Sequence, residues 1–210
     1  MKANTVDLSK IKISCGDCNL SELCLPRGLH QDELTLLERI IKRSTPLHKG
    51  DHLFRAGDPL GSIFAVRSGA IKLYPLDDSG AEKIQGFYLP GELVGLDAIN
   101  GERHMGFAIA LETSSFCAIP FQRLEEISRQ LPGLGRQLLK LMSREISHEN
   151  RLLLSLANRS AEERIASFLL NLSGRYRTLG YSAQELRLPM QRTDIGMFLG
   201  LTFETVSRIF

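Results

Sequence analysis

"RTDIGMFLGLTFETVSRIF", residues 192–210, has the pattern of two short helices that cross at a tight turn. Gly196 is small where the second helix would press on the first, and Gly200 can take the positive φ that a sharp bend needs. Thr202 is a suitable N-cap for the second helix, and Glu204 stands favourably in its first turn. Apolar residues stand where the two helices must pack, at Ile195, Leu199, Leu201, Val206 and Ile209. The stretch therefore predicts a helix-turn-helix.

In such a unit the N-terminal residues of the second helix enter the major groove of DNA. Arg208 can bond a guanine bidentately, Glu204 can accept from a cytosine amine, and Ser207 suits several bases. Thr202 and Thr205 complete the predicted DNA-binding face. The alternative is an ordinary pair of helices packed in a core, but the polar, arginine-tipped face favours double-stranded DNA as a partner.

The distribution of charge points to the same end of the chain. The 210 residues contain 26 lysines and arginines and 24 aspartates and glutamates, a formal net charge of +2. Residues 159–210 contain seven arginines, no lysine and five acids, so the 19 basic and 19 acidic residues before them cancel. An excess carried by arginine is a mild indication of phosphate or base contacts. Solvated arginines on ordinary helices would give the same count.

The middle of the chain predicts short antiparallel strands. Ten of the 18 glycines fall between Gly50 and Gly106 and separate segments such as SIFAVRS, AIKLYPL and KIQGFYL. Short strands that end in Gly or Asp-Ser-Gly turns are typical of an antiparallel barrel or roll. A helix is expected before them over residues 31–45. Its apolar residues recur at helical spacing: Leu34, Leu37, Ile40 and Ile41.

Residues 134–158, LGRQLLKLMSREISHENRLLLSLAN, predict one long helix with two stripes. The first has the spacing of a coiled-coil seam and comprises Leu139, Met142, Ile146, Glu149, Leu153 and Leu156. The second could face the roll and comprises Leu138, Leu141, Glu145 and Leu152. Two stripes on one helix indicate that it lies between its own domain and a second copy. We therefore expect a homodimer whose interface is the first stripe.

These features predict an α+β fold with an antiparallel β-roll, a long dimerisation helix and a C-terminal helix-turn-helix. The expected regions are a cysteine-bearing loop over 1–30, the β-roll sensor domain over 31–132, the dimerisation helix over 133–158 and the helix-turn-helix domain over 159–210. Ser160 and Glu163 form a capping box that opens the first helix of the last domain. Ser173-Gly174 is expected to end that helix, and the hinge between domains is expected at Asn158-Arg159.

The start of the sequence has no apolar segment typical of a secretory signal, and no run approaches the ~18 apolar residues of a membrane span. A cytoplasmic protein with no membrane partner is therefore expected, and thiols stay reduced in that compartment. Disulfides are disfavoured, which leaves metal binding or redox chemistry for the cysteines. The histidines are expected in polar loops or on exposed faces, with a haem ligand as the minor alternative: His30, His48, His52, His104 and His148.

Three of the four cysteines lie within ten residues, Cys15-x₂-Cys18-x₅-Cys24, and the fourth is Cys117. A zinc ribbon has two C-x-x-C pairs, and c-type haem needs a histidine where this chain has Asn19. A thioredoxin-like motif belongs in a βαβ unit, which this region lacks. Four thiolates from two segments suit zinc or an iron–sulfur cluster. Cys117 as a merely buried thiol remains an alternative.

The sequence resembles the fumarate–nitrate regulator (FNR) branch of the cyclic-AMP receptor superfamily. The resemblance runs from about Cys15 to Phe210 and is carried by CGDCNLSELC, FAVRSGAIK, LVGLDAI, ALETSSFCAIPF, LMSREI, AEERIASFLLNLS and DIGMFLGLTFETVSR. It implies a [4Fe–4S] cluster on Cys15, Cys18, Cys24 and Cys117, which oxygen degrades to a [2Fe–2S] form so that the dimer falls apart.

The resemblance also implies how the DNA is read. Glu204, Ser207 and Arg208 match the family's E-x-x-S-R and would read half-sites like TTGAT in an inverted repeat. Regulation would be mostly activation, and at some genes repression, of anaerobic metabolism through contacts with RNA polymerase.

Two features depart from the superfamily's pattern. Relatives that bind cyclic nucleotides place an Arg-Ser/Thr pair in the roll, where this chain has Met105 and Gly106. Without that arginine a phosphate would be buried unpaired, so no cyclic nucleotide is expected. Relatives also continue beyond the position of Phe210 with a further helical stretch and a β-wing. The chain is therefore expected to be a truncated form whose own DNA binding is weak or absent.

The leading hypothesis is an oxygen-responsive, dimeric DNA-binding regulator that is not an enzyme. One alternative keeps the fold and replaces the cluster by structural zinc or by thiol redox sensing. The alternative from another class is a thiol redox enzyme that uses Cys15 and Cys18, for which the sequence offers no general base and no substrate pocket.

Overall fold

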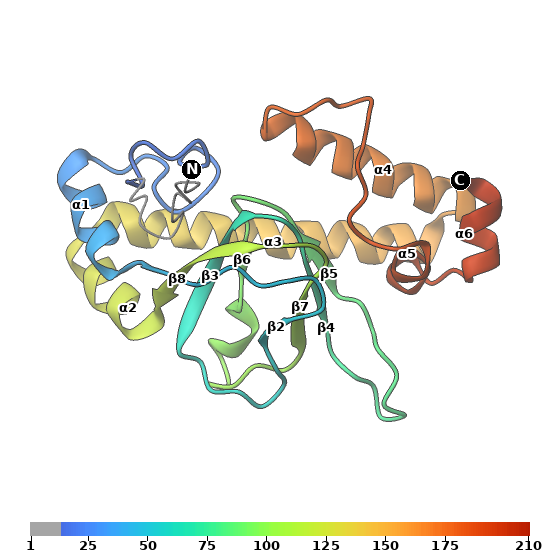
Figure 1. Ribbon diagram of the computed structural model, residues 1–210, viewed down its shortest axis with the longest axis horizontal. Coiled ribbons are helices and arrows are strands. Elements are labelled where there is room, and N and C mark those ends of the chain that lie inside the picture. Colours follow the sequence, from blue (N-terminus) through green and yellow to red (C-terminus); the bar gives the residue numbers. More distant parts are fainter. Residues whose placement is uncertain (1–13) are drawn as a thin grey trace, which may run out of the picture.

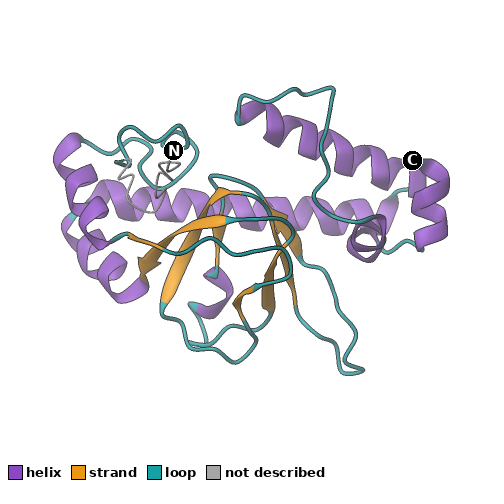
Figure 2. Ribbon diagram, in the orientation of Figure 1, coloured by secondary structure: helices purple, strands orange, loops and turns teal. Residues whose placement is uncertain are grey.

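The computed structural model describes residues 14–210, so the first part of the predicted 1–30 loop lies outside the described residues. Two four-stranded antiparallel sheets form a roll, one long helix crosses it, and a group of helices stands at the C-terminal end (Figure 1). Coloured by secondary structure, the strands lie together below the long helix while the helices gather around them (Figure 2). The α+β fold class is confirmed.

The strands of the roll are short. One sheet has the order β1-β8-β3-β6 and the other the order β2-β7-β4-β5. Their bounds are β1 Lys42–Arg43, β2 His52–Phe54, β3 Ser62–Ser68, β4 Ile71–Tyr74, β5 Gly86–Tyr88, β6 Leu93–Val94, β7 Phe107–Ala110 and β8 Ser115–Pro120. The predicted segment SIFAVRS is β3, and β4 and β5 lie inside the other two quoted segments.

Helices pack outside the roll. Their bounds are α1 Gln31–Ile40, the short 3₁₀ helix η2 Leu96–Ala98, α2 Phe121–Gln130, α3 Pro132–Asn158, α4 Ala161–Thr178, α5 Arg192–Leu199 and α6 Phe203–Ile209. The helix expected over 31–45 was predicted too long. It ends at Ile40 because Lys42 and Arg43 instead pair with β8, opposite Ala118 and Cys117.

Helix α4 begins as predicted and ends later than predicted. Ser160 accepts from the Glu163 backbone N–H, and the Glu163 side chain caps Ser160 in return. The helix then continues through Ser173-Gly174, and the positive φ that follows its end is at Gly180. A glycine in a helix interior costs about 1 kcal/mol relative to alanine. Contacts that the last turn makes with the roll, described below, accompany this extension.

Three buried clusters hold the elements together. One lies between the two sheets around Phe116 and Ile71. A second joins the roll to α1, α2 and the first half of α3. The third crosses the predicted domain boundary, because Phe87 of β5 packs with Phe168 of α4 and Phe198 of α5 at ring separations of 6.1 and 5.2 Å. The β-roll and the helix-turn-helix therefore share one core.

Helix α3 presents two different faces, as its two stripes predicted. The inner face carries buried Leu141, and the carboxylate of Glu145 accepts from the Tyr88 hydroxyl at 2.9 Å. On the outer face Leu139, Ile146 and Leu153 are 67%, 57% and 63% exposed. The remaining residues of the first stripe, Met142, Glu149 and Leu156, are partly buried on the flank of that face.

The expectation that all histidines lie at the surface is wrong for His104. This side chain is 4% exposed, and its ring stacks on Phe54 with 3.6 Å between centroids. Its Nδ1 lies 3.2 Å from a carboxylate oxygen of Asp97, which satisfies the buried nitrogen. Within residues 14–210 there is no helix with both the length and the apolar character that crossing a membrane requires.

Candidate functional site

The cysteine loop, residues 14–29, is a series of tight turns packed onto two helices. Backbone N–H groups donate back along the chain, from Ser21 to the Cys18 carbonyl at 2.9 Å and from Cys24 to the Leu20 carbonyl at 3.0 Å. The Glu38 carboxylate of α1 accepts from the Cys15 backbone N–H. Gln137 of α3, itself buried, donates from Nε2 to the Cys24 carbonyl at 3.2 Å. Both helices thus hold the loop through its cysteines.

Strand β8 brings the fourth cysteine to this loop. Cys117 pairs in register with Ala65 of β3, so its position is set by the sheet. Each of the six pairs among the four thiols interacts electrostatically. Two segments about ninety residues apart in the sequence therefore converge on one site. The four thiols are Cys15, Cys18, Cys24 and Cys117.

Burial makes three of these thiols, those of Cys15, Cys24 and Cys117, poor acids. Desolvation, together with the neighbouring thiols, raises the pKa of Cys15 to about 12. The pKa of Cys24 also rises to about 12, chiefly by desolvation. Desolvation likewise raises the pKa of Cys117, although Arg67 and Arg43 act to lower it. Thiols in this environment carry a negative charge only beside a compensating positive one, which is what a bound metal centre provides.

The predicted helix-turn-helix is present with the geometry that its sequence indicated. Gly200 ends α5 with φ 64°, and the Thr202 hydroxyl caps α6 by accepting from the Thr205 N–H at 3.2 Å. A Cβ at Gly196 would lie 2.8 Å from the Leu201 carbonyl oxygen, so the close crossing of the two helices requires glycine there. Val206 is fully buried between the helices.

The predicted DNA-reading residues do not all face outward. Thr202, Glu204 and Arg208 are exposed, and Thr205 is partly buried with its hydroxyl 3.1 Å from that of Thr202. The Ser207 hydroxyl oxygen is shielded from solvent and has no hydrogen-bond partner among residues 14–210. Contact between Ser207 and a base therefore requires this hydroxyl to rotate outward.

Two polar contacts between the roll and the DNA-binding helices have no counterpart in the sequence analysis. Lys72 of β4 donates to Asp194 of α5 at 3.1 Å and to Glu82 at 2.8 Å. Although desolvation acts to lower it, these carboxylates raise the pKa of Lys72 overall. Arg175 of α4 binds Glu92 and a carbonyl of the roll. The partners are 122 and 83 residues apart, so no local pattern could have revealed them.

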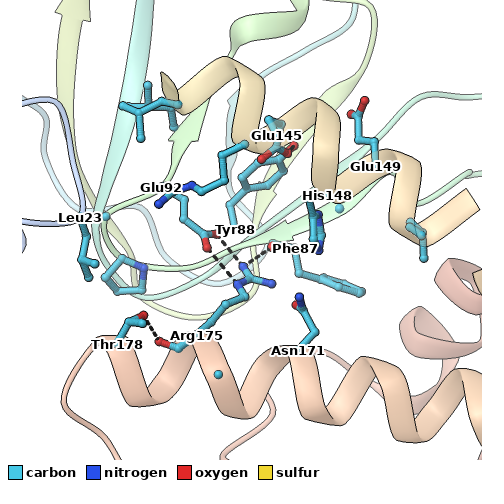
Figure 3. Close-up of a pocket in the computed structure, with 18 of the residues that line it drawn as sticks. Leu23, Phe87, Tyr88, Glu92, Glu145, His148, Glu149, Asn171, Arg175 and Thr178 are labelled. Atoms are coloured by element: carbon cyan, nitrogen blue, oxygen red, sulfur yellow. Dashed lines mark hydrogen bonds and ion pairs between the residues drawn. The ribbon is translucent and has the colours of Figure 1, made fainter. Parts of the chain in front are cut away.

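The Arg175 contact lies at the edge of a cavity of about 380 Å³ between the roll, α3 and α4. Figure 3 shows Glu92, Glu145 and His148 pointing into this space from the roll and α3, with Arg175 and Asn171 reaching toward it from α4. Cations and carboxylates both line it. The cavity therefore lies between domains with a mixed polar and apolar lining and no single sign of charge.

Comparisons with known proteins match both halves of the chain. The model of the cyclic nucleotide-binding domain matches residues 45–130, and that of the Crp-like helix-turn-helix domain matches residues 163–210. The transcriptional activator protein Anr of Pseudomonas aeruginosa is 55% identical over 93% of this chain and 80% of its own length. The fumarate and nitrate reduction regulatory protein of Vibrio cholerae is 49% identical over 94% of this chain and 79% of its own.

A solved structure agrees with the sequence relatives. FixK2 from Bradyrhizobium japonicum superposes with a TM-score of 0.73 at 31% identity, covering 81% of this chain and 82% of that one. The match extends over most of both chains, so it includes the roll and the DNA-binding helices together.

Two glycines give opposite predictions for stability. Gly200→Ala should lower the free energy of unfolding by about 1–2 kcal/mol, because the left-handed φ of 64° disfavours a Cβ. Gly174→Ala, inside α4 with no atom within 4 Å of the added Cβ, should raise it by about 0.5–1 kcal/mol. Urea denaturation followed by circular dichroism measures both. Equal effects of the two substitutions would contradict the assigned turn.

Proposed function

The chain belongs to the fumarate–nitrate regulator type of the Crp/FNR family of transcription regulators, and from this premise we propose that oxygen controls its DNA binding through a [4Fe–4S] cluster. Cys15, Cys18, Cys24 and Cys117 would hold the cluster. Its oxidisable iron and sulfide would supply the response to oxygen. The chain is accordingly a regulator and not an enzyme.

The convergence of the four partly buried thiols is the observation that carries this proposal. Tetrahedral ligands at about 2.3 Å from one zinc ion must lie within about 4 Å of each other. Among residues 14–210 no three His, Cys, Asp or Glu side chains are close enough to share one metal ion, yet all six thiol pairs interact. Four thiols gathered from two segments fit a cluster, in which each thiolate takes a different iron. The raised pKa of the Cys15 thiol disfavours a reactive-thiol enzyme that uses it.

The residues around the thiols would pass the state of the site to the rest of the protein. Gln137 and Glu38 order the loop by binding the backbone of Cys24 and Cys15. Because Gln137 belongs to α3, ordering of the loop bears directly on the helix that carries the predicted dimer seam. Exposed Leu139, Ile146 and Leu153 supply an apolar stripe for the second copy.

In a two-fold dimer the pair of α6 helices would enter successive major grooves of an inverted repeat. Arg208 and Glu204 are the exposed base-reading side chains of that helix, with Ser207 behind them. The relatives' role as transcriptional activators makes RNA polymerase the expected protein partner. The lack of an arginine at Met105 and Gly106 keeps cyclic nucleotides out of the proposal.

Cluster ligation can be tested by removing the distant ligand. Cys117→Ser should prevent cluster assembly as completely as Cys18→Ser, because the cluster needs four thiolates. The measurements are iron and sulfide content and the broad absorbance near about 400 nm after anaerobic reconstitution. Ala118→Ser, the next residue of β8, adds the same hydroxyl and should leave assembly intact. Full iron and sulfide in the Cys117→Ser protein would refute Cys117 as the fourth ligand, and a colourless parent that binds zinc would refute the cluster.

Base reading can be tested as discrimination between DNA sites. In a version extended through a complete β-wing, Arg208→Ala should cost about 1–3 kcal/mol on a TTGAT-type inverted repeat and almost nothing on a repeat whose half-site guanines are replaced. Arg187→Ala removes an exposed arginine outside α6 and should leave the preference between the two sites unchanged. Fluorescence anisotropy at one fixed salt concentration measures both. An equal loss on both sites would reduce Arg208 to a phosphate contact.

The dimer seam can be tested with two equally exposed apolar residues of α3. Ile146 is 57% exposed and Leu154 is 64% exposed. Leu154, eight residues later, stands about 80° round the helix from Ile146 and is not part of the seam. Ile146→Ser should raise the dimer dissociation constant about tenfold or more, since two buried side chains are lost per dimer, whereas Leu154→Ser should change it little. Sedimentation of the reconstituted protein gives the constants. Similar constants for the two variants would place the interface elsewhere.

A further inference from the structure

The turn over residues 89–92, which follows β5, lies between the cysteine loop and helix α4. Its backbone is anchored to β3, because the Gly91 N–H donates to the Val66 carbonyl and the Glu92 carbonyl accepts from the Val66 N–H, both at 2.9 Å. The Glu92 side chain closes the turn by accepting from the Leu89 N–H at 2.9 Å. The turn is therefore a defined unit, closed by its own side chain and bonded to β3.

The cysteine loop rests directly on this turn. Leu23, the residue before Cys24, approaches so closely that a Cβ at Gly91 would lie 2.9 Å from the Leu23 Cβ. Gly91 also has a φ of 89°, which glycine adopts freely. In Figure 3 Leu23 lies on the side of the turn away from α3, close to the end of α4. The side chain of Leu23, one residue before Cys24, thus packs against the turn at Gly91.

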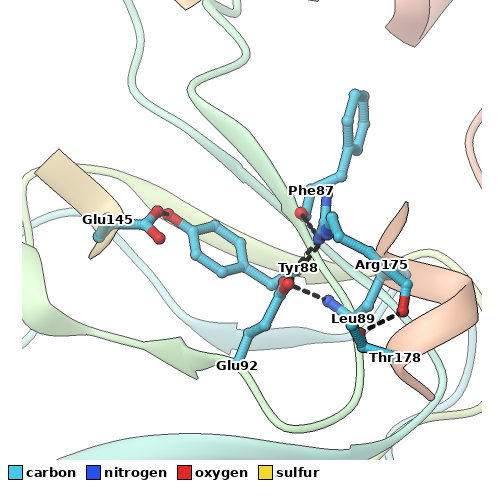
Figure 4. A network of polar contacts seen from close by, with 7 residues as sticks. All are labelled: Phe87, Tyr88, Leu89, Glu92, Glu145, Arg175 and Thr178. Atoms are coloured by element: carbon cyan, nitrogen blue, oxygen red, sulfur yellow. Dashed lines mark hydrogen bonds and ion pairs between the residues drawn. The ribbon is translucent and has the colours of Figure 1, made fainter. Parts of the chain in front are cut away.

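Helix α4 is held by the same turn from the other side. Arg175 Nε donates to Glu92 Oε1 at 2.9 Å, its Nη2 donates to Glu92 Oε2, and Nη2 also donates to the Phe87 carbonyl at 2.6 Å. Figure 4 shows the guanidinium set between the Glu92 carboxylate and the β5 backbone. The two side chains are 19% and 26% exposed, so the pair is largely screened from water. Such a two-pronged pair fixes direction as well as distance.

We propose that Glu92 and Arg175 are positioning residues that orient the DNA-binding domain according to how the cysteine loop packs on the 89–92 turn. The inference rests on the proposed function in treating the cysteine loop as the regulated element. Glu92 Oε2 accepts from both the Leu89 N–H and Arg175, so a displaced turn cannot keep both bonds. Helix α4 shares its core with α5 and α6. The two α6 helices of a dimer match an inverted repeat at only one separation. A change in the orientation of α4 within each protomer would therefore alter DNA binding, in addition to any change in dimerisation.

Amide hydrogen exchange of α4 tests this coupling without requiring a cluster. Leu23→Ala should speed exchange in the 89–92 turn and in α4 roughly fivefold, because the loop no longer holds the turn. Arg175→Lys should speed amide exchange in α4 by a similar factor, since lysine keeps the positive charge but cannot make the two-pronged contact of the guanidinium. In the double variant the amides of the 89–92 turn should exchange as fast as in Leu23→Ala, while those of α4 should exchange no faster than in Arg175→Lys alone. The inference would be overturned if the two substitutions multiplied each other's effect on the exchange rates of α4, or if Leu23→Ala left those rates unchanged.

A matched control separates this path from general loosening. Glu112→Gln breaks another contact between the roll and the C-terminal domain, the 3.1 Å pair of Glu112 with largely exposed Arg187. In that background Leu23→Ala should still speed α4 fivefold, and loss of its effect would count against the specific path. Iron and sulfide analysis of the same preparations tests the cluster separately. If the two substitutions do not multiply their effects on α4 exchange but no cluster assembles, the proposed function alone is refuted. If the cluster assembles but the two effects multiply, this inference alone is refuted.

Discussion

Burial of the inner face of α3 on the roll is the constraint from which the rest of the arrangement follows. Near its start Gln137 binds the Cys24 carbonyl, midway Glu145 accepts from Tyr88, and toward its end Leu152 packs into the core shared with the DNA-binding helices. The helix is continuous over 27 residues, so these three regions are fixed along one axis. On its outer face Leu139, Ile146 and Leu153 are exposed among residues 14–210, which leaves an apolar stripe open to the proposed second copy.

The sequence predicted those features that depend on neighbours in the chain. The spacing of α3, the turn at Gly200 and the cap at Thr202 are local patterns, and all are present. Local patterns misled where tertiary contacts decide, as at the end of α4, where Arg175 lies beyond Ser173-Gly174. The close set of Cys15, Cys18 and Cys24 was visible as spacing. The approach of Cys117 was an expectation from chemistry, because the pairing of β8 that places it has no signature in the sequence near the other three.

Apolar and polar contacts have different roles where the roll meets the DNA-binding helices. The rings of Phe87, Phe168 and Phe198 bury apolar surface where the two parts meet. Burial of apolar surface is not directional, so it does not by itself fix one alignment of the two surfaces. Lys72 with Asp194 adds direction, because a buried ion pair that loses its partner leaves an uncompensated charge. Charged pairs of this kind add little net stability and instead select one alignment among several. The domain arrangement is thus held by the rings and specified by the charges.

The common core of roll and helices has a consequence for how regulators of this architecture diversify. A helix-turn-helix excised from this chain would carry the rings of Phe168 and Phe198 as an uncovered aromatic patch, a feature that promotes self-association. Its grafting onto a foreign sensor would need a surface already shaped to receive those rings. A variant that keeps strand β5 together with α4, α5 and α6 keeps this core, so side chains on α6 can change while the pairing of domains stays fixed.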